Sequence, residues 1–106
     1  MRATLHTLEQ TIRQRRSADP STSYVAKLAA RGRAKIAQKV GEEAVETVIA
    51  AMADDHAEIV GESADLIFHL MMLLADMDVP FDAVLDELDR REGVSGIAEK
   101  AARPKD

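Results

Sequence analysis

Carboxylates recur at helical spacing in two neighbouring segments of this chain. The first segment reads KVGEEAVETV, the second reads ESAD, and together they carry Glu42, Glu43, Glu46, Glu62 and Asp65. Residues three or four apart share one face of a helix, so a short turn between two helices would bring the acidic faces together. A carboxylate without a positive partner is costly to bury. Oxygen-rich sites suit Mg²⁺, which keeps some of its water ligands when it binds carboxylates and can also bind the phosphate of a substrate. We therefore predict a magnesium site.

A solvated helix face is the alternative interpretation of these residues. Runs of charge mostly cover surfaces, and the pattern E-E-x-x-E on its own favours that interpretation. The pattern E-x-x-D in the next segment, which is strongly apolar, favours the metal site instead. His69 continues the second acidic stripe four residues after Asp65 and could be a ligand or an acid. A single histidine on an apolar helix is more often a hydrogen-bonded core residue, and the sequence leaves both roles open.

The densest basic stretch lies just before and within the first acidic segment. It contains Lys27, Arg31, Arg33, Lys35 and Lys39. These side chains could bind phosphate oxygens, or they could simply balance the carboxylates, and the sequence favours neither role over the other.

Helical spacing and capping residues divide the chain into helices. We expect helices over residues 4–16, 24–31 and 33–53, a fourth from the caps Asp54 and Asp55 to about Met77, and a fifth with Pro80 in its first turn that stops near Gly93. Gly32 should close the second helix in a left-handed conformation. No alternating run is long enough for a strand, so the expected fold class is all-α, with four to five helices in an antiparallel bundle. Residues 94–106 should form an irregular C-terminal tail.

The third expected helix is apolar on nearly every side. Residues 44–53 read AVETVIAAMA, in which only Glu46 and Thr47 are polar. Such a helix is normally enclosed by others, so we expect Glu46 to have little access to water. The third and fourth helices present more apolar faces than one domain of 106 residues can cover. We therefore expect a homo-oligomer, most simply a dimer, whose assembly completes the core.

Composition limits the class of protein. The length of 106 residues predicts a single domain over residues 1–106, and the 46% of hydrophobic residues include only 3% aromatics. The absence of cysteine favours the reducing cytoplasm and leaves oxygen atoms as the abundant metal ligands. A formal net charge of −5 argues against a nucleic-acid partner. The N-terminus lacks the apolar stretch of a secretory signal, and the longest apolar run, residues 66–75, is shorter than the ~20 residues that span a membrane.

Longer motifs connect the chain to known enzymes. E-E-x-x-E followed by E-x-x-D resembles the all-α nucleoside-triphosphate pyrophosphohydrolases, which include MazG-type enzymes and dimeric dUTPases. The stretches SYVAKL, KVGEEAVETVIAA, ESADLIFHLMMLL and SGIAEKAAR together resemble the phosphoribosyl-ATP pyrophosphohydrolase family of histidine biosynthesis. The resemblance covers nearly the whole chain after residue 4. The chain departs from the family pattern at Pro80, where a capping residue is expected, and at Ala102, where serine is common.

The resemblance implies roles for particular residues. Glu43, Glu46, Glu62 and Asp65 become the expected Mg²⁺ ligands, and Glu42 a supporting or second-metal residue. The implied reaction is the second step of histidine biosynthesis, the hydrolysis of the α–β phosphoanhydride of phosphoribosyl-ATP to phosphoribosyl-AMP and pyrophosphate. Water is the nucleophile, and Glu46 is the candidate to accept its proton.

Substrate contacts follow from the same resemblance. Lys27, Lys35, Lys39 and Lys100 are candidates to hold the triphosphate, and Tyr24 to pack against a base or ribose. The resemblance also assigns Ser95, Gly96, Glu99 and Lys100 to a site or an interface. Two rival functions remain, a house-cleaning pyrophosphohydrolase with a different base pocket and a non-catalytic helical dimerisation module.

Overall fold

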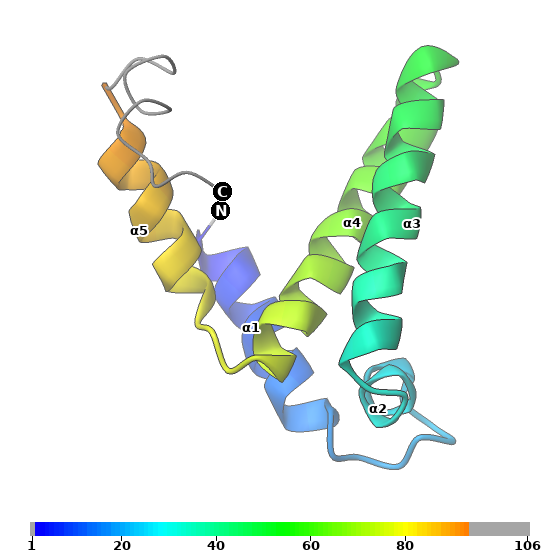
Figure 1. The fold of residues 1–106 in the computed structure, drawn as a ribbon, viewed down its shortest axis with the longest axis vertical. Coiled ribbons are helices and arrows are strands. Elements are labelled where there is room, and N and C mark those ends of the chain that lie inside the picture. Colours follow the sequence, from blue (N-terminus) through cyan, green and yellow to red (C-terminus); the bar gives the residue numbers. More distant parts are fainter. Residues whose placement is uncertain (1, 94–106) are drawn as a thin grey trace.

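The computed structural model describes residues 2–93 and contains five helices in that range (Figure 1). They are α1 (Arg2–Arg15), α2 (Tyr24–Ala30), α3 (Arg33–Met52), α4 (His56–Asp76) and α5 (Phe81–Arg91). Because this part of the chain forms helices and no strands, the all-α fold class is confirmed. The predictions for the tail, including those for Lys100 and Ala102, lie outside the described residues.

The α3–α4 hairpin is the longest feature of the fold and forms one arm of a V (Figure 1). Its turn is short because Asp54 adopts a positive φ of 54° and Asp55 caps α4 at once. The Asp55 carboxylate accepts a hydrogen bond of 3.0 Å from the Glu58 backbone N–H, which satisfies one of the free donors at the start of a helix. The predicted cap and tight antiparallel turn are therefore confirmed.

The apolar core lies at the base of the V. There, α1 and α2 pack against the lower parts of α3 and α4 (Figure 1). Its buried side chains come from all five helices and are Ile12, Val25, Leu28, Ile36, Met71, Met72, Ala75 and Phe81. Ile12 and Ile36 are the most completely buried of the large side chains, at 1% and 0% exposure. The core therefore fixes the lower ends of α3 and α4.

Two helix boundaries differ in detail from the sequence expectations. Pro80 precedes α5 as its N-cap and does not lie in the first turn. Proline cannot cap through a side-chain oxygen, and Glu9 of α1 supplies the missing acceptor, with Oε2 2.7 Å from the Phe81 backbone nitrogen. Gly32 has the expected positive φ, at 90°, but Arg31 is the C-cap of α2, and Gly32 is the N-cap that precedes α3.

The upper half of the α3–α4 arm exposes apolar side chains. Val45 and Val48 are each 59% exposed, Ile49 is 61% exposed and Met52 is 82% exposed. Glu46 on the same stretch is exposed as well. The expectation that Glu46 has little access to water is therefore wrong for the single chain, because α4 covers only one side of this end of α3 and α1, α2 and α5 lie away from it (Figure 1). Within residues 2–93, no helix is long and apolar enough to cross a membrane.

Candidate metal centre

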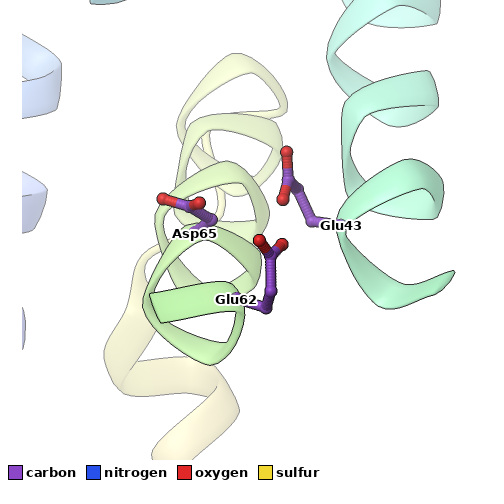
Figure 2. A group of neighbouring side chains, drawn as sticks. All are labelled: Glu43, Glu62 and Asp65. Atoms are coloured by element: carbon purple, nitrogen blue, oxygen red, sulfur yellow. The ribbon is translucent and has the colours of Figure 1, made fainter. Parts of the chain in front are cut away.

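Three carboxylates meet across the α3–α4 hairpin. Glu43 extends from α3 toward α4, and Glu62 and Asp65 lie one turn apart on α4 (Figure 2). One oxygen from each carboxylate lies within 4.8 Å of one oxygen from each of the others. The three side chains converge because the antiparallel pairing of the two helices places the two acidic stripes opposite each other. This acidic triad of Glu43, Glu62 and Asp65 is the geometry expected of carboxylates that share a cation.

The triad contains buried oxygen atoms that no group in the described part of the chain satisfies. Glu43 is only 7% exposed, and its Oε2 and the Oε2 of Glu62 are buried without a hydrogen-bond partner. Buried acceptors of this kind are rare because leaving them unpaired costs free energy. A hard divalent cation offers such oxygens what they lack, so the donor set fits Mg²⁺.

Glu46 adjoins the triad through Glu62. Contact with the Glu46 carboxylate is the largest cause that raises the pKa of Glu62 to about 7, followed by burial of Glu62 and by contact with Glu43. Two ionised carboxylates have no hydrogen to share, so one of them retains a proton when no cation is near. Glu46 and Glu62 also line an open hollow of about 400 Å³ together with Ile49, Ala50, Ala53, Asp55 and Glu58.

Glu42 lies apart from the triad. Its carboxylate accepts a 2.7 Å hydrogen bond from Gln38 and lies 3.3 Å from the Lys39 ammonium. These contacts, with Gln38 first, hold the pKa of Glu42 below its usual value. The structure therefore places Glu42 with the basic side chains of its own helix and does not bring it to the triad.

The predicted basic residues are at different distances from the acidic triad. Lys39 lies beside it, with its ammonium 3.7 Å from Glu43 Oε1, and contact with Glu42 is the main cause that raises the pKa of Lys39. Lys35 lies near enough to Glu42 to help lower the pKa of that carboxyl. Lys27 lines a separate open hollow of about 630 Å³ with Tyr24 and the segment 20–23.

His69 is a hydrogen-bonded core residue. It is 5% exposed, Nδ1 lies 2.7 Å from the Asp65 carbonyl oxygen, and Nε2 lies 2.8 Å from the Tyr24 hydroxyl. Both ring nitrogens are occupied, which leaves neither for a metal. The Tyr24 contact was not predictable from the sequence, because it joins residues 45 positions apart on two helices.

The triad makes the stability of the metal-free protein depend on pH. The pKa of Glu62 is about 7 in the folded protein and about 4.5 when unfolded, so between these values the folded state binds a proton that the unfolded state lacks. The melting temperature in the presence of a chelator should therefore fall as pH rises from 5 to about 7, and this contribution should then level off. Glu62→Gln should remove it. If the melting temperatures of the wild-type protein and of Glu62→Gln changed by the same amount between pH 5 and 7, the prediction would be contradicted.

A family comparison covers almost all of the described chain. The model of the family described as phosphoribosyl-ATP pyrophosphohydrolase matches residues 5–92. The chain belongs to this family. The match to the phosphoribosyl-ATP pyrophosphohydrolase family includes the acidic triad, Glu46, Tyr24 and His69, whereas Lys100 lies beyond it.

Individual relatives agree with the family match. A phosphoribosyl-ATP pyrophosphatase of Rhizorhabdus wittichii is 70% identical over 105 residues, which is 99% of each chain. A phosphoribosyl-ATP pyrophosphatase of Novosphingobium aromaticivorans is 72% identical over 96 residues, covering 91% of this chain and 90% of the relative. One from Zymomonas mobilis is 63% identical over 102 residues, covering 96% and 95%. The family resemblance inferred from the sequence is thus confirmed over nearly the full length.

Proposed function

We propose that this protein hydrolyses the α–β phosphoanhydride of phosphoribosyl-ATP and releases phosphoribosyl-AMP and pyrophosphate. Its relatives of 62–72% identity carry the name phosphoribosyl-ATP pyrophosphatase. The observation that supports the chemistry best is the acidic triad with its two unpartnered buried oxygens. A phosphoanhydride substrate brings its own negative charge, so a site made of carboxylates needs a cation between itself and the substrate.

We assign the Mg²⁺ ligands to the acidic triad, with Glu46 as a further ligand or as the base. When bound, Mg²⁺ would neutralise charge on the phosphate oxygens and on the leaving pyrophosphate. Glu46 is suited to accept the proton of the attacking water because it is exposed and borders the hollow beside Glu62. The water oxygen forms a bond to the α phosphorus as the bond from that phosphorus to the bridging oxygen breaks, and the electron pair of the broken bond leaves with the pyrophosphate.

Cations of the chain complete the proposed site. The Lys39 ammonium lies beside Glu43 and can donate hydrogen bonds to phosphate oxygens that approach the triad. Lys35, Lys27 and Lys100 stay candidates for the more distant phosphates, and Glu42 for holding Lys39 in place. We further propose a homodimer through the exposed apolar face of α3 and a cytoplasmic location, which the lack of cysteine favours.

The substrate assignment is tested by comparing phosphoribosyl-ATP with ATP, dUTP and dCTP in the presence of Mg²⁺. Pyrophosphate release should be fastest with phosphoribosyl-ATP by at least about tenfold in kcat/KM, because only that substrate carries the second ribosyl phosphate. Equal or faster turnover of a free nucleotide would instead assign the protein to the house-cleaning pyrophosphohydrolases. No turnover and no Mg²⁺ affinity would indicate a non-catalytic helical module.

A further inference from the structure

Tyr24, His69 and Asp65 form a continuous line of hydrogen bonds next to the acidic triad. The His69 ring lies between α2 and α4, with Nδ1 on the Asp65 carbonyl oxygen and Nε2 on the Tyr24 hydroxyl. The contact to Asp65 is made by its backbone carbonyl and not by its carboxylate, so the line does not use the proposed metal-binding oxygens. It links the first residue of α2 to the turn of α4 that carries Asp65.

The line has a fixed direction. A backbone carbonyl only accepts hydrogen bonds, so His69 must donate from Nδ1 to Asp65. A neutral imidazole that donates from one nitrogen must accept at the other, so the Tyr24 hydroxyl donates its hydrogen to Nε2. That hydrogen is then unavailable to a ligand, and the Tyr24 oxygen can offer a ligand only its lone pairs.

Packing holds the Tyr24 ring in one place while leaving it accessible. Its ring centroid lies 6.0 Å from that of Phe68 and 5.8 Å from that of His69, and the Tyr24 and His69 rings meet edge to face. Tyr24 is nevertheless 50% exposed and borders the open hollow that Lys27 also lines. The Tyr24 hydroxyl is joined through His69 to the backbone of Asp65, which places the tyrosine near the triad. A buried histidine therefore anchors a half-exposed tyrosine close to the proposed site.

We propose that Tyr24 is a specificity-determining residue that accepts a hydrogen bond from a neutral donor of the bound nucleotide, and that His69 is a positioning residue that directs it. The inference rests on the proposed function and deepens it. Phosphate groups that are fully ionised carry no donor, so Tyr24 recognises the nucleoside part of the substrate. The donor is a ribosyl hydroxyl or the exocyclic nitrogen of the base, which share this chemistry.

Tyr24→Phe tests the proposal, because it keeps the ring and removes only the hydroxyl, and with it both the acceptor and the donor to His69. We expect KM for phosphoribosyl-ATP to rise about three- to tenfold, which corresponds to the usual net contribution of one neutral hydrogen bond. The value of kcat should stay within about twofold of that of the wild-type protein. Inhibition by inorganic pyrophosphate, which has neither ribose nor base, should stay unchanged. Thr7→Val on α1 is the matched control, because it also removes one hydroxyl, and within the described structure that hydroxyl bonds only to its own helix. The KM of this control should equal that of the wild-type protein.

His69→Gln separates positioning from general stability. Glutamine retains a donor and an acceptor, so this variant should fold, and its KM should rise by no more than that of Tyr24→Phe. Because His69 acts through Tyr24, adding His69→Gln to Tyr24→Phe should give no further rise in KM. Additive effects of the two substitutions would overturn the positioning role.

Substrate analogues identify the donor. Analogues that lack one ribosyl hydroxyl or the exocyclic nitrogen should bind more weakly to the wild-type protein than phosphoribosyl-ATP does. The analogue that lacks the true donor should bind Tyr24→Phe with the same affinity as it binds the wild-type protein. An unchanged KM for Tyr24→Phe, or pyrophosphate inhibition that weakens in parallel, would overturn the inference while phosphoribosyl-ATP hydrolysis by the wild-type protein still stands. Failure of the wild-type protein to hydrolyse phosphoribosyl-ATP would instead overturn the proposed function.

Discussion

Glu62→Gln should lower kcat/KM for phosphoribosyl-ATP by about 10³-fold and weaken Mg²⁺ binding. The substitution keeps the shape of the side chain but removes one anionic oxygen from the acidic triad. Anionic ligands offset the cost of dehydrating Mg²⁺, and a metal ion typically supplies several kcal/mol of charge stabilisation in the transition state. Each 1.36 kcal/mol corresponds to a factor of ten in rate, so the loss of about three such steps is expected.

Turnover, calorimetric Mg²⁺ binding and metal-free melting should be measured together on this variant. The melting temperature without metal should be equal to or above that of the wild-type protein at pH 8, because the crowding that raises the pKa of Glu62 is relieved. Glu92→Gln is the matched control, since Glu92 is exposed beyond the end of α5. Near-wild-type turnover by Glu62→Gln would remove the metal site from the mechanism.

Val48→Asp should raise the dissociation constant of the proposed homodimer by at least about 100-fold. Val48 belongs to the apolar face of α3 with Val45, Ile49 and Met52, and it is 59% exposed in the single chain. An aspartate there stays hydrated in the monomer, so monomer stability should change by less than about 1 kcal/mol. In a closed interface the same carboxylate would lose its water at a cost of several kcal/mol, and each 1.4 kcal/mol is a factor of ten in affinity.

Sedimentation of wild-type protein and variant over a range of concentrations checks this prediction. Thr7→Asp introduces the same charge on an exposed position of α1 and should leave the assembly intact. A wild-type protein that sediments as a monomer at micromolar concentration would remove the interface altogether, and a Val48→Asp protein that remains dimeric would place the interface on a different surface.

The α3–α4 hairpin was predictable because its determinants are local. Asp55 and the acidic residues at helical spacing act within one turn of their own helix, so the sequence alone indicates the cap and the two acidic stripes. Placing Glu43 opposite Glu62 needed only the further inference that a short turn makes the helices antiparallel. The triad therefore follows from patterns that lie within about three turns of helix on either side of the connection.

Features that depend on distant partners were not predictable in this way. The exposure of Glu46 depends on which helices cover the upper end of α3, and no spacing rule specifies that. The contact of Tyr24 with His69 depends on how α2 crosses the base of the V, and the sequence offered only a tyrosine and a histidine 45 positions apart. Glu42 matched the acidic pattern as well as Glu43 did, but one residue along a helix turns a side chain by about 100°, and this rotation carries Glu42 out of the triad and onto Gln38.

The carboxylate that caps α5 belongs to α1, and the bond from the Phe81 N–H to Glu9 joins residues 72 positions apart. A helix of 11 residues is too short to be stable alone in water, and α5 has no capping side chain of its own. The order of assembly follows from these facts: α5 can persist only after the N-terminal helix has docked, so it is expected to form late in folding. Deleting the first helix would then unravel the far end of the described chain, although the two segments are remote in sequence.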